Sequence, residues 1–295
     1  MTAASPTLDP RLAAWLQQLN QLIEEQKAQG IVMTPAMARD SLAGLTATFV
    51  TERPALGRVT DITVVEAGRK IPLRLYDPAP AVAKPVCLFF HGGGHMAGSV
   101  DVYDPIARRL AQHSGQLVVS VDYRLAPETP YPGGLEDCLA VARTLWQTLA
   151  THQIATQRSL TLVGDSGGGT FAATVAARLA DEKDIGLNKL VLIYPSLDYT
   201  LSFPSINDNG EGYLLEKARI RWYFDHYFQH GEDRHQASPL WAPLPSTLPP
   251  TLVITAGYCP LRDEGVAYAN KLLDAGMPCQ LYPVPGAIHA YLNLE

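Results

Sequence analysis

The chain has 295 residues, of which 47% are hydrophobic and 18% are charged, enough for one large hydrophobic core of the kind found in enzymes. Its formal net charge of -6 argues against nucleic acid or anionic lipid as a partner, because such binding depends on clustered Lys and Arg. No stretch approaches the roughly 18 consecutive apolar residues that a membrane span requires. We therefore expect a cytoplasmic protein without a membrane span.

Four cysteines are too few and too scattered for a disulfide framework or a metal site: Cys87, Cys138, Cys259 and Cys279. Most of them are expected to be plain buried thiols.

The first fifty residues have helical spacing and little strand signal. Apolar residues recur every three or four positions, at Leu12, Trp15, Leu16, Leu19, Leu22 and Ile23. Asp9 before Pro10 predicts the start of this helix, Gly30 its end, and Thr34 with Pro35 the start of a second helix. Residues 1–50 are either ordinary packing helices or a cap over an active site, and both interpretations stay open.

From Val59 onward the pattern changes to paired strands, with a turn at Ala67 to Lys70, and then to strands that alternate with helices. Five apolar runs predict buried strands, at residues 86–90, 116–123, 160–165, 189–198 and 251–258, and helical segments lie near 103–113, 132–150 and 167–181. Strands that are apolar on both faces indicate an α/β protein with a mainly parallel sheet covered by helices on both sides.

The aromatic segment at residues 199–236, which contains RWYFDHYF, interrupts this alternation. We expect it to be a helical insertion over the carboxyl edge of the sheet, where such folds bind ligands. The expected organisation is a helical segment at 1–50 and a core at 51–295 that carries this insertion.

The most informative motif is Gly164-Asp165-Ser166-Gly167-Gly168, which lies between a predicted strand and a predicted helix. Small residues around a serine permit the tight turn that raises its hydroxyl above the sheet, with a helix N-terminus behind it. As a bare pattern G-x-S-x-G is common and often marks only a turn. Its position between strand and helix favours Ser166 as a nucleophile.

A second motif, His91-Gly92-Gly93-Gly94, follows the strand VCLFF. Glycines let the backbone approach a ligand and direct its N–H groups toward an oxyanion, although a flexible turn would have the same composition. The phosphate-loop pattern G-x-x-x-x-G-K-[ST] is absent.

The base of such a site should be a histidine late in the chain, because folds of this type place the nucleophile, the acid and the histidine in that order. His289 follows the strand QLYPV and fits this position. His91 belongs to the glycine turn. The other histidines lie in predicted helices or polar segments and are expected at the surface: His95, His113, His152, His226, His230 and His235.

These residues resemble those of the hormone-sensitive-lipase-like carboxylesterases of the α/β-hydrolase superfamily. The similarity runs from about residue 55 to the end, with HGGG at 91, YRLAPE at 123, GDSGGG at 164, YPSLD at 194, SPL at 238, PLRDEG at 260 and G-x-x-H at 286. The resemblance implies an α/β-hydrolase fold with a cap and the hydrolysis of short-chain carboxylic esters without metal or cofactor. It further implies a small-molecule ester as partner, a homodimer, and oxyanion donors at the N–H groups of Gly93, Gly94 and Gly167.

The sequence departs from this family at three places. Gly167 replaces the usual alanine, and the chain stops at Glu295, where the family usually continues into a helix that would support the loop of His289. Cys259 stands where the family has the aspartate of the catalytic triad. That carboxylate holds the imidazole in the productive tautomer and stabilises the imidazolium, and a neutral thiol does neither well.

Three hypotheses remain for the triad acid. In order of preference, the site has no acid at all, or the acid is Asp198 at the end of the strand at 189–198, or it is Asp263 one helical turn beyond Cys259. Cys259 as the nucleophile ranks last, because it lacks the turn and the oxyanion donors. Cys259 could also have been introduced by engineering. Two functions follow. The protein is either a serine carboxylesterase slowed by Cys259 or a small-molecule binding protein on a hydrolase scaffold, similar to the plant gibberellin receptors.

Overall fold

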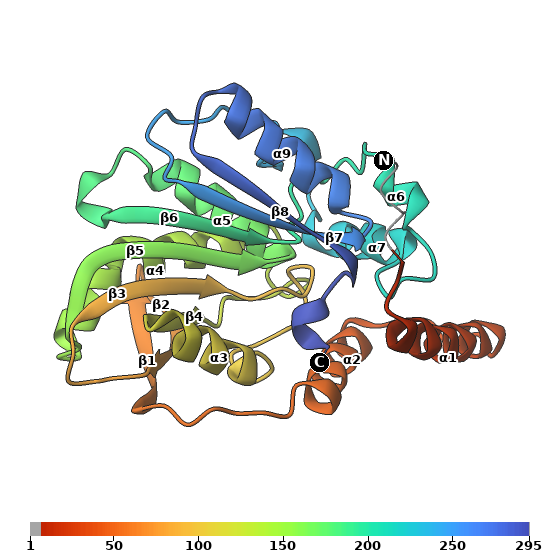
Figure 1. Cartoon of the computed structure of the whole chain (residues 1–295), viewed down its shortest axis with the longest axis horizontal. Helices are drawn as coiled ribbons and strands as arrows, with labels where there is room; N and C mark the ends of the chain where they lie inside the picture. The colour runs from red at the N-terminus through yellow and green to blue at the C-terminus, as the bar shows by residue number, and fades with distance from the viewer. Residues whose placement is uncertain (1–6, 295) are drawn as a thin grey trace.

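The computed structural model describes residues 7–294, in which eight strands form one sheet in the order β1-β2-β4-β3-β5-β6-β7-β8 (Figure 1). The strands are β1 (Arg58–Glu66), β2 (Arg69–Asp77), β3 (Lys84–Phe90), β4 (Leu117–Val121), β5 (Thr156–Asp165), β6 (Leu187–Ile193), β7 (Thr251–Tyr258) and β8 (Cys279–Ile288). Only β2 runs antiparallel to its neighbours β1 and β4, and the strands from β4 to β8 are mutually parallel. This confirms the predicted mainly parallel sheet.

Helices cover the two faces of the sheet and create two separate hydrophobic clusters. One cluster contains buried residues of α4 (Gly133–Thr151), α5 (Gly167–Leu179) and α9 (Arg262–Asp274). The other contains those of α3 (Asp104–Ser114), which lies on the near side of the sheet in Figure 1, while α4 and α5 lie behind it. Burial of apolar side chains on both faces is the main force that holds the strands in place.

The prediction of a strand through Asp198 is wrong, because β6 ends at Ile193. Tyr194 has a φ of 33°, and Pro195 has no N–H to continue the ladder, so the backbone leaves the sheet at this point. Asp198 therefore lies in the loop after β6 rather than in the sheet.

Two N-terminal helices, α1 (Pro10–Ala28) and α2 (Pro35–Phe49), begin at the predicted residues. Asp9 accepts a hydrogen bond from the backbone N–H of Arg11, and Thr34 accepts one from that of Met37, which satisfies otherwise free donors of each first turn. Both helices lie beyond the carboxyl ends of the parallel strands, and α1 projects from the body of the molecule (Figure 1).

The segment after β6 contains α6 (Ser205–Asp208), α7 (Lys217–Tyr227) and α8 (Arg234–Ala237). Aromatic rings of α7 and the next residue pack on Tyr199, with the rings of Phe224 and Phe228 at 4.9 Å and 4.8 Å from it. Short 3₁₀ turns lie at Lys183–Ile185 (η1) and Tyr291–Asn293 (η2). Across residues 7–294, no helix has the length and apolar character needed to cross a membrane.

Candidate active site

Ser166 lies on a strained turn between β5 and α5. Its φ of 53° and ψ of -121° are rarely adopted by residues with a side chain, and the turn is held by the packing around it. A Cβ at Gly164 would lie 2.1 Å from the carbonyl oxygen of Gly168, and one at Gly168 would lie 2.0 Å from that of Phe90. The small residues of this motif are therefore required for α5 to approach the sheet closely and leave the hydroxyl of Ser166 at its edge.

Three side chains distant in the sequence meet at the carboxyl ends of the strands. His289, directly after β8, has its Nε2 2.9 Å from Oγ of Ser166. Its Nδ1 lies 3.1 Å from Sγ of Cys259, directly after β7, and the backbone N–H of Leu261 donates to the same sulfur over 3.3 Å. The sulfur of Cys259 thus occupies the position in which a triad carboxylate would accept two hydrogen bonds.

The thiol at this position is neutral. Cys259 is fully buried, and this burial raises the pKa of its thiol far above the usual range. A neutral S–H is a weak donor and its sulfur a weak acceptor. If the thiol donates to Nδ1, then Nε2 carries the imidazole hydrogen and cannot accept the proton of Ser166. The structure therefore retains the geometry of a triad but lacks the charge that selects the productive tautomer.

Burial also lowers the pKa of His289 to about 3. A histidine acts as a base only when it is neutral, so with His289 in that role kcat/KM should remain constant through mildly acidic pH and fall only as the pH drops toward this pKa. An aspartate at position 259 would place a negative charge beside Nδ1 and raise the pKa of His289. We expect the acid limb of a Cys259→Asp variant to lie at higher pH than that of the unchanged protein. Profiles of kcat/KM from about pH 4 to pH 8 test this: the profile of the unchanged protein should be flat, and an equally flat profile for Cys259→Asp would contradict the prediction.

The glycine loop after β3 borders the same cavity as Ser166. Gly93 has a φ of 121° and Gly94 one of 61°, and both line the same cavity as Gly167. Asp165 ties this loop to the turn of Ser166, because its carboxylate accepts from the backbone N–H of Gly92 over 2.8 Å and from the hydroxyl of Tyr103 over 3.0 Å. Burial raises the pKa of Asp165 to about 7. The sequence shows Asp165 within the serine motif. Its hydrogen bonds with Gly92 and Tyr103 are visible only in the tertiary structure, because these residues come from distant segments.

His95 is buried beside Gly167, so the prediction of a surface position is wrong. Its ring stacks on that of Tyr227 at 4.1 Å, and its Nε2 lies 2.9 Å from the hydroxyl of Tyr199. A Cβ on Gly167 would lie 3.1 Å from its Cε1, tighter than ordinary van der Waals contact. A side chain at position 167 would therefore require the imidazole of His95 to shift, which favours glycine there. The position of His95 directly after the HGGG motif is the sequence signal from which its burial beside this motif could have been predicted.

The remaining six histidines differ in their exposure to solvent. His91 is buried in the glycine loop, His226 is partly exposed, and four are exposed as expected: His113, His152, His230 and His235. Within the described part of the chain, no group of three or more His, Cys, Asp or Glu side chains is arranged to hold a metal ion.

The two alternative carboxylates are engaged elsewhere. The oxygens of Asp198 accept hydrogen bonds from the backbone and hydroxyl groups of Thr200 and Ser202 and from the indole N–H of Trp241. Burial alone would raise the pKa of Asp198, but these hydrogen bonds outweigh it and hold the pKa below its usual range. Asp263 accepts from the backbone N–H of Ser205 and from the side chain of Arg262. Neither carboxylate occupies the Nδ1 side of His289, where Cys259 lies.

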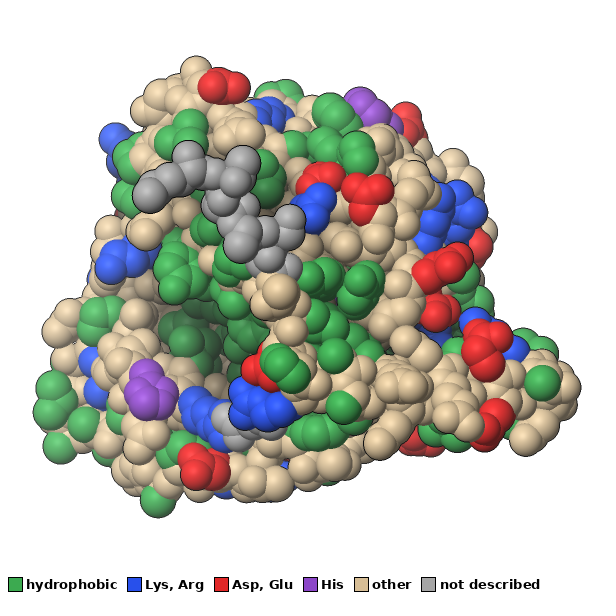
Figure 2. Space-filling view, turned by 45° about the vertical axis from the view of Figure 1, so that its right-hand side comes forward, with side chains coloured by type: hydrophobic (Ala, Val, Ile, Leu, Met, Phe, Trp, Pro, Cys, Tyr) green, Lys and Arg blue, Asp and Glu red, His purple; other side chains and the backbone are tan. Residues whose placement is uncertain are grey.

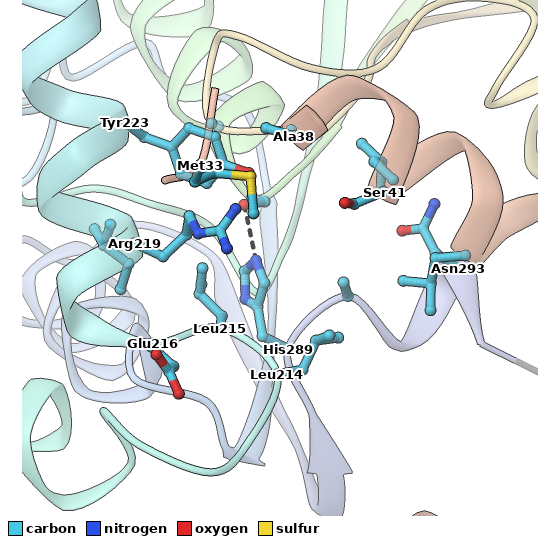
Figure 3. Close-up of a pocket in the computed structure, with 18 of the residues that line it drawn as sticks. Met33, Ala38, Ser41, Leu214, Leu215, Glu216, Arg219, Tyr223, His289 and Asn293 are labelled. Carbon is cyan, nitrogen blue, oxygen red and sulfur yellow. Dashed lines mark hydrogen bonds between the residues drawn. The ribbon is translucent and has the colours of Figure 1, made fainter. Parts of the chain in front are cut away.

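A cavity of about 420 Å³ opens above Ser166 and His289. It is lined by α1, α2, the region of α7 and the glycine loop, mostly with apolar side chains such as Trp15, Leu19, Leu42, Leu215 and Phe224. Figure 2 shows a hollow in one face of the molecule with hydrophobic side chains inside it, and Figure 3 shows His289 at the cavity, between residues of α2 and α7. The C-terminal side of the site is held to α2 by a hydrogen bond of 2.9 Å from the amide of Asn293 to Thr46.

Comparison with known proteins agrees with this geometry. A family model described as the alpha/beta hydrolase fold matches residues 87–293. An ethyl acetate hydrolase of Pseudomonas putida is 35% identical over 98% of this chain and 93% of its own, and a carboxylesterase of Mycobacterium tuberculosis is 39% identical over 76% and 72%. A hyperthermophilic esterase from the archaeon Pyrobaculum calidifontis superposes with a TM-score of 0.87, at 34% identity, over 97% of this chain and 92% of that one.

Similarity of this extent agrees with the geometry of a serine on a strand-to-helix turn in contact with a histidine. The chain is a carboxylic ester hydrolase and belongs to the hormone-sensitive-lipase-like carboxylesterases of the α/β-hydrolase superfamily.

Proposed function

We propose that the protein hydrolyses carboxylic esters through an acyl-enzyme on Ser166, with His289 as the base and with Cys259 in place of the acid. The observation that carries this proposal is the contact of 2.9 Å between Oγ of Ser166 and Nε2 of His289. As Oγ attacks the ester carbonyl, Nε2 takes its proton and then delivers it to the leaving alcohol. Water, activated by the same nitrogen, releases the acid.

Three backbone N–H groups are proposed to stabilise the tetrahedral oxyanion, those of Gly93, Gly94 and Gly167. Two observations support this assignment. Gly93 and Gly94 have a positive φ, which turns the loop toward Ser166, and all three glycines line the same cavity. Donors fixed in this way stabilise the developing charge without having to reorganise during the reaction.

Short-chain esters are the proposed substrates. The relative from Pseudomonas putida is an ethyl acetate hydrolase, and most of its length matches this chain. We further propose that α1, α2 and α7 form a cap that sets the acyl length, because their apolar side chains line the cavity above Ser166. The cytoplasmic location and the homodimer stay predictions from the sequence.

Replacing Ser166 with alanine is expected to reduce turnover of p-nitrophenyl butyrate to the level of the uncatalysed reaction, because the attacking atom is lost. The matched control is Ser114→Ala, which removes an exposed hydroxyl at the end of α3 and should leave turnover unchanged. Initial rates of the three proteins provide the measurement. Equal rates for the unchanged protein and Ser166→Ala would end the proposal.

The alternative, a binding protein on a hydrolase scaffold, is favoured by one observation: the fully buried, neutral thiol beside Nδ1 of His289. It predicts that the unchanged protein and Ser166→Ala have the same rate while both bind an ester. Calorimetric titration of the Ser166→Ala variant with a soluble ester, read beside the rate assay, separates the two functions.

A further inference from the structure

One cation in the cavity has no part in the ester chemistry described above. Arg219 extends from α7 into the cavity, and its guanidinium points toward the side where His289 lies (Figure 3). A guanidinium remains charged at all ordinary pH values and carries five N–H donors. Arg219 makes a side-chain hydrogen bond to Tyr223, and because most of the surrounding lining is apolar, its other donors are available to a bound molecule.

The other charged side chains that line the cavity make no ion pair with Arg219. Lys27 and Glu216 also line it, and their charged atoms lie 3.8 Å apart, with Lys27 additionally bound to Glu24 at 2.8 Å. Asp165 lies under the glycine loop and is bound to Gly92 and Tyr103. Across residues 7–294, Arg219 takes part in no ion pair, so no carboxylate of the protein binds its guanidinium directly.

Contacts along α7 fix the position of this charge in the cavity that Ser166 and His289 also line. The guanidinium carbon of Arg219 lies 5.8 Å from the ring centroid of Trp222, within range of a cation–π interaction. Burial raises the pKa of Tyr223, and the adjacent Arg219 opposes this rise. The ring of Tyr223 covers Gly94 so closely that a Cβ there would lie 2.7 Å from it. Arg219 therefore adjoins the ring that covers the proposed oxyanion loop.

We propose that Arg219 binds a free carboxylate on the substrate, so that the site prefers esters carrying this group, such as mono-esters of dicarboxylic acids, over neutral esters of the same size. The proposal rests on the proposed esterase function and names its substrate class. Guanidinium and carboxylate form two parallel charged hydrogen bonds, which both strengthen and orient binding. The carboxylate could belong to the acyl or to the alcohol part of the ester, and the chemistry of recognition is the same for both.

Two pairs of substrates test the proposal. Monomethyl and dimethyl glutarate differ in an acyl-side charge, and 4-carboxyphenyl acetate and phenyl acetate differ in an alcohol-side charge. The ratio of kcat/KM for the charged over the neutral ester is measured for each pair. Arg219→Met should lower at least one ratio by on the order of 10-fold, the effect of a hydrogen bond between charged groups. The pair that responds identifies the side of the ester that carries the carboxylate.

Three comparisons make the result specific. Arg219→Lys keeps the charge and should retain part of the preference. Arg221→Met, a change of the same kind at an exposed residue of α7, should leave both ratios unchanged. Added salt should reduce the preference of the unchanged protein, because it screens the charge. Ratios in Arg219→Met equal to those of the unchanged protein would overturn the proposal even if the enzyme is active.

A binding measurement separates this inference from the proposed function. Ser166→Ala and its Arg219→Met double variant are titrated by calorimetry with monomethyl glutarate, while thermal unfolding confirms that both are folded. Weaker binding by the double variant supports the carboxylate site even if neutral esters show no turnover, in which case only the esterase proposal fails. Equal binding, or none by either variant, overturns the carboxylate site.

Discussion

Replacing Cys259 with aspartate is expected to raise kcat by roughly 10²- to 10⁴-fold, since the loss of the triad carboxylate costs about 10⁴ in the serine proteases. The site is already built for this group. A carboxylate in place of the sulfur would accept from Nδ1 of His289 and from the backbone N–H of Leu261, which now lie 3.1 Å and 3.3 Å from Sγ. Its charge would fix the imidazole hydrogen on Nδ1 and stabilise the imidazolium formed during attack.

The matched control for this prediction is Cys259→Asn, which has the shape of aspartate without its charge and should not produce the increase. Turnover of p-nitrophenyl butyrate by the three proteins is the measurement. Flat activity in Cys259→Asp together with abolished activity in Asp198→Asn would show that Asp198 serves as the acid. We expect instead that Asp198→Asn acts mainly on stability, because its carboxylate binds Thr200, Ser202 and Trp241.

Replacing Gly93 with alanine is expected to lower kcat by about 10²- to 10³-fold, the effect of losing an oxyanion donor. Its φ of 121° disfavours any side chain, and a Cβ would lie 2.2 Å from the backbone carbonyl oxygen of Ala97, which cannot move like a flexible side chain. The glycine loop must therefore shift away from Ser166. Steady-state kinetics with p-nitrophenyl butyrate measure the effect.

The control for backbone strain is Gly68→Ala, in the turn between β1 and β2. Gly68 also has a positive φ, of 77°, but a Cβ there would meet nothing within 4 Å. It should lower stability slightly and leave kcat unchanged. Thermal unfolding of both variants distinguishes a displaced loop from an unfolded protein, and a folded Gly93→Ala variant with full activity would remove Gly93 from the proposed oxyanion site.

The fold and the strand-to-helix turn at Ser166 could be predicted from the sequence because their signals are local. Apolar runs of strand length, separated by helical periodicity, indicate a buried parallel sheet wherever they occur. The turn at Ser166 needs small neighbours, and the structure shows why: the backbone carbonyl oxygens of Phe90 and Gly168 leave no room for a Cβ. Capping residues such as Asp9 and Thr34 mark helix starts within a few positions of themselves.

Other features depend on contacts between distant segments, which periodicity does not encode. His95 was expected at the surface because its neighbours are polar or small, yet rings from two other parts of the chain, Tyr199 and Tyr227, enclose it. Arg219 belongs to a helix whose sequence gives no sign of which face borders the cavity. Asp198 was placed in a strand that ends five residues earlier, because Pro195 breaks the ladder.

The sequence by itself determined the fold class, the serine on its turn, the late histidine and the anomaly at Cys259, since each follows from a local pattern or from a motif of fixed spacing. Only the tertiary structure decided which groups surround His289, whose partners Ser166 and Cys259 lie 123 and 30 residues away in the chain. The physical reason is the parallel sheet, because its strand order and register bring the carboxyl ends of β5, β7 and β8 together. There the buried, neutral thiol of Cys259 lies beside His289, where a triad carboxylate would carry a negative charge.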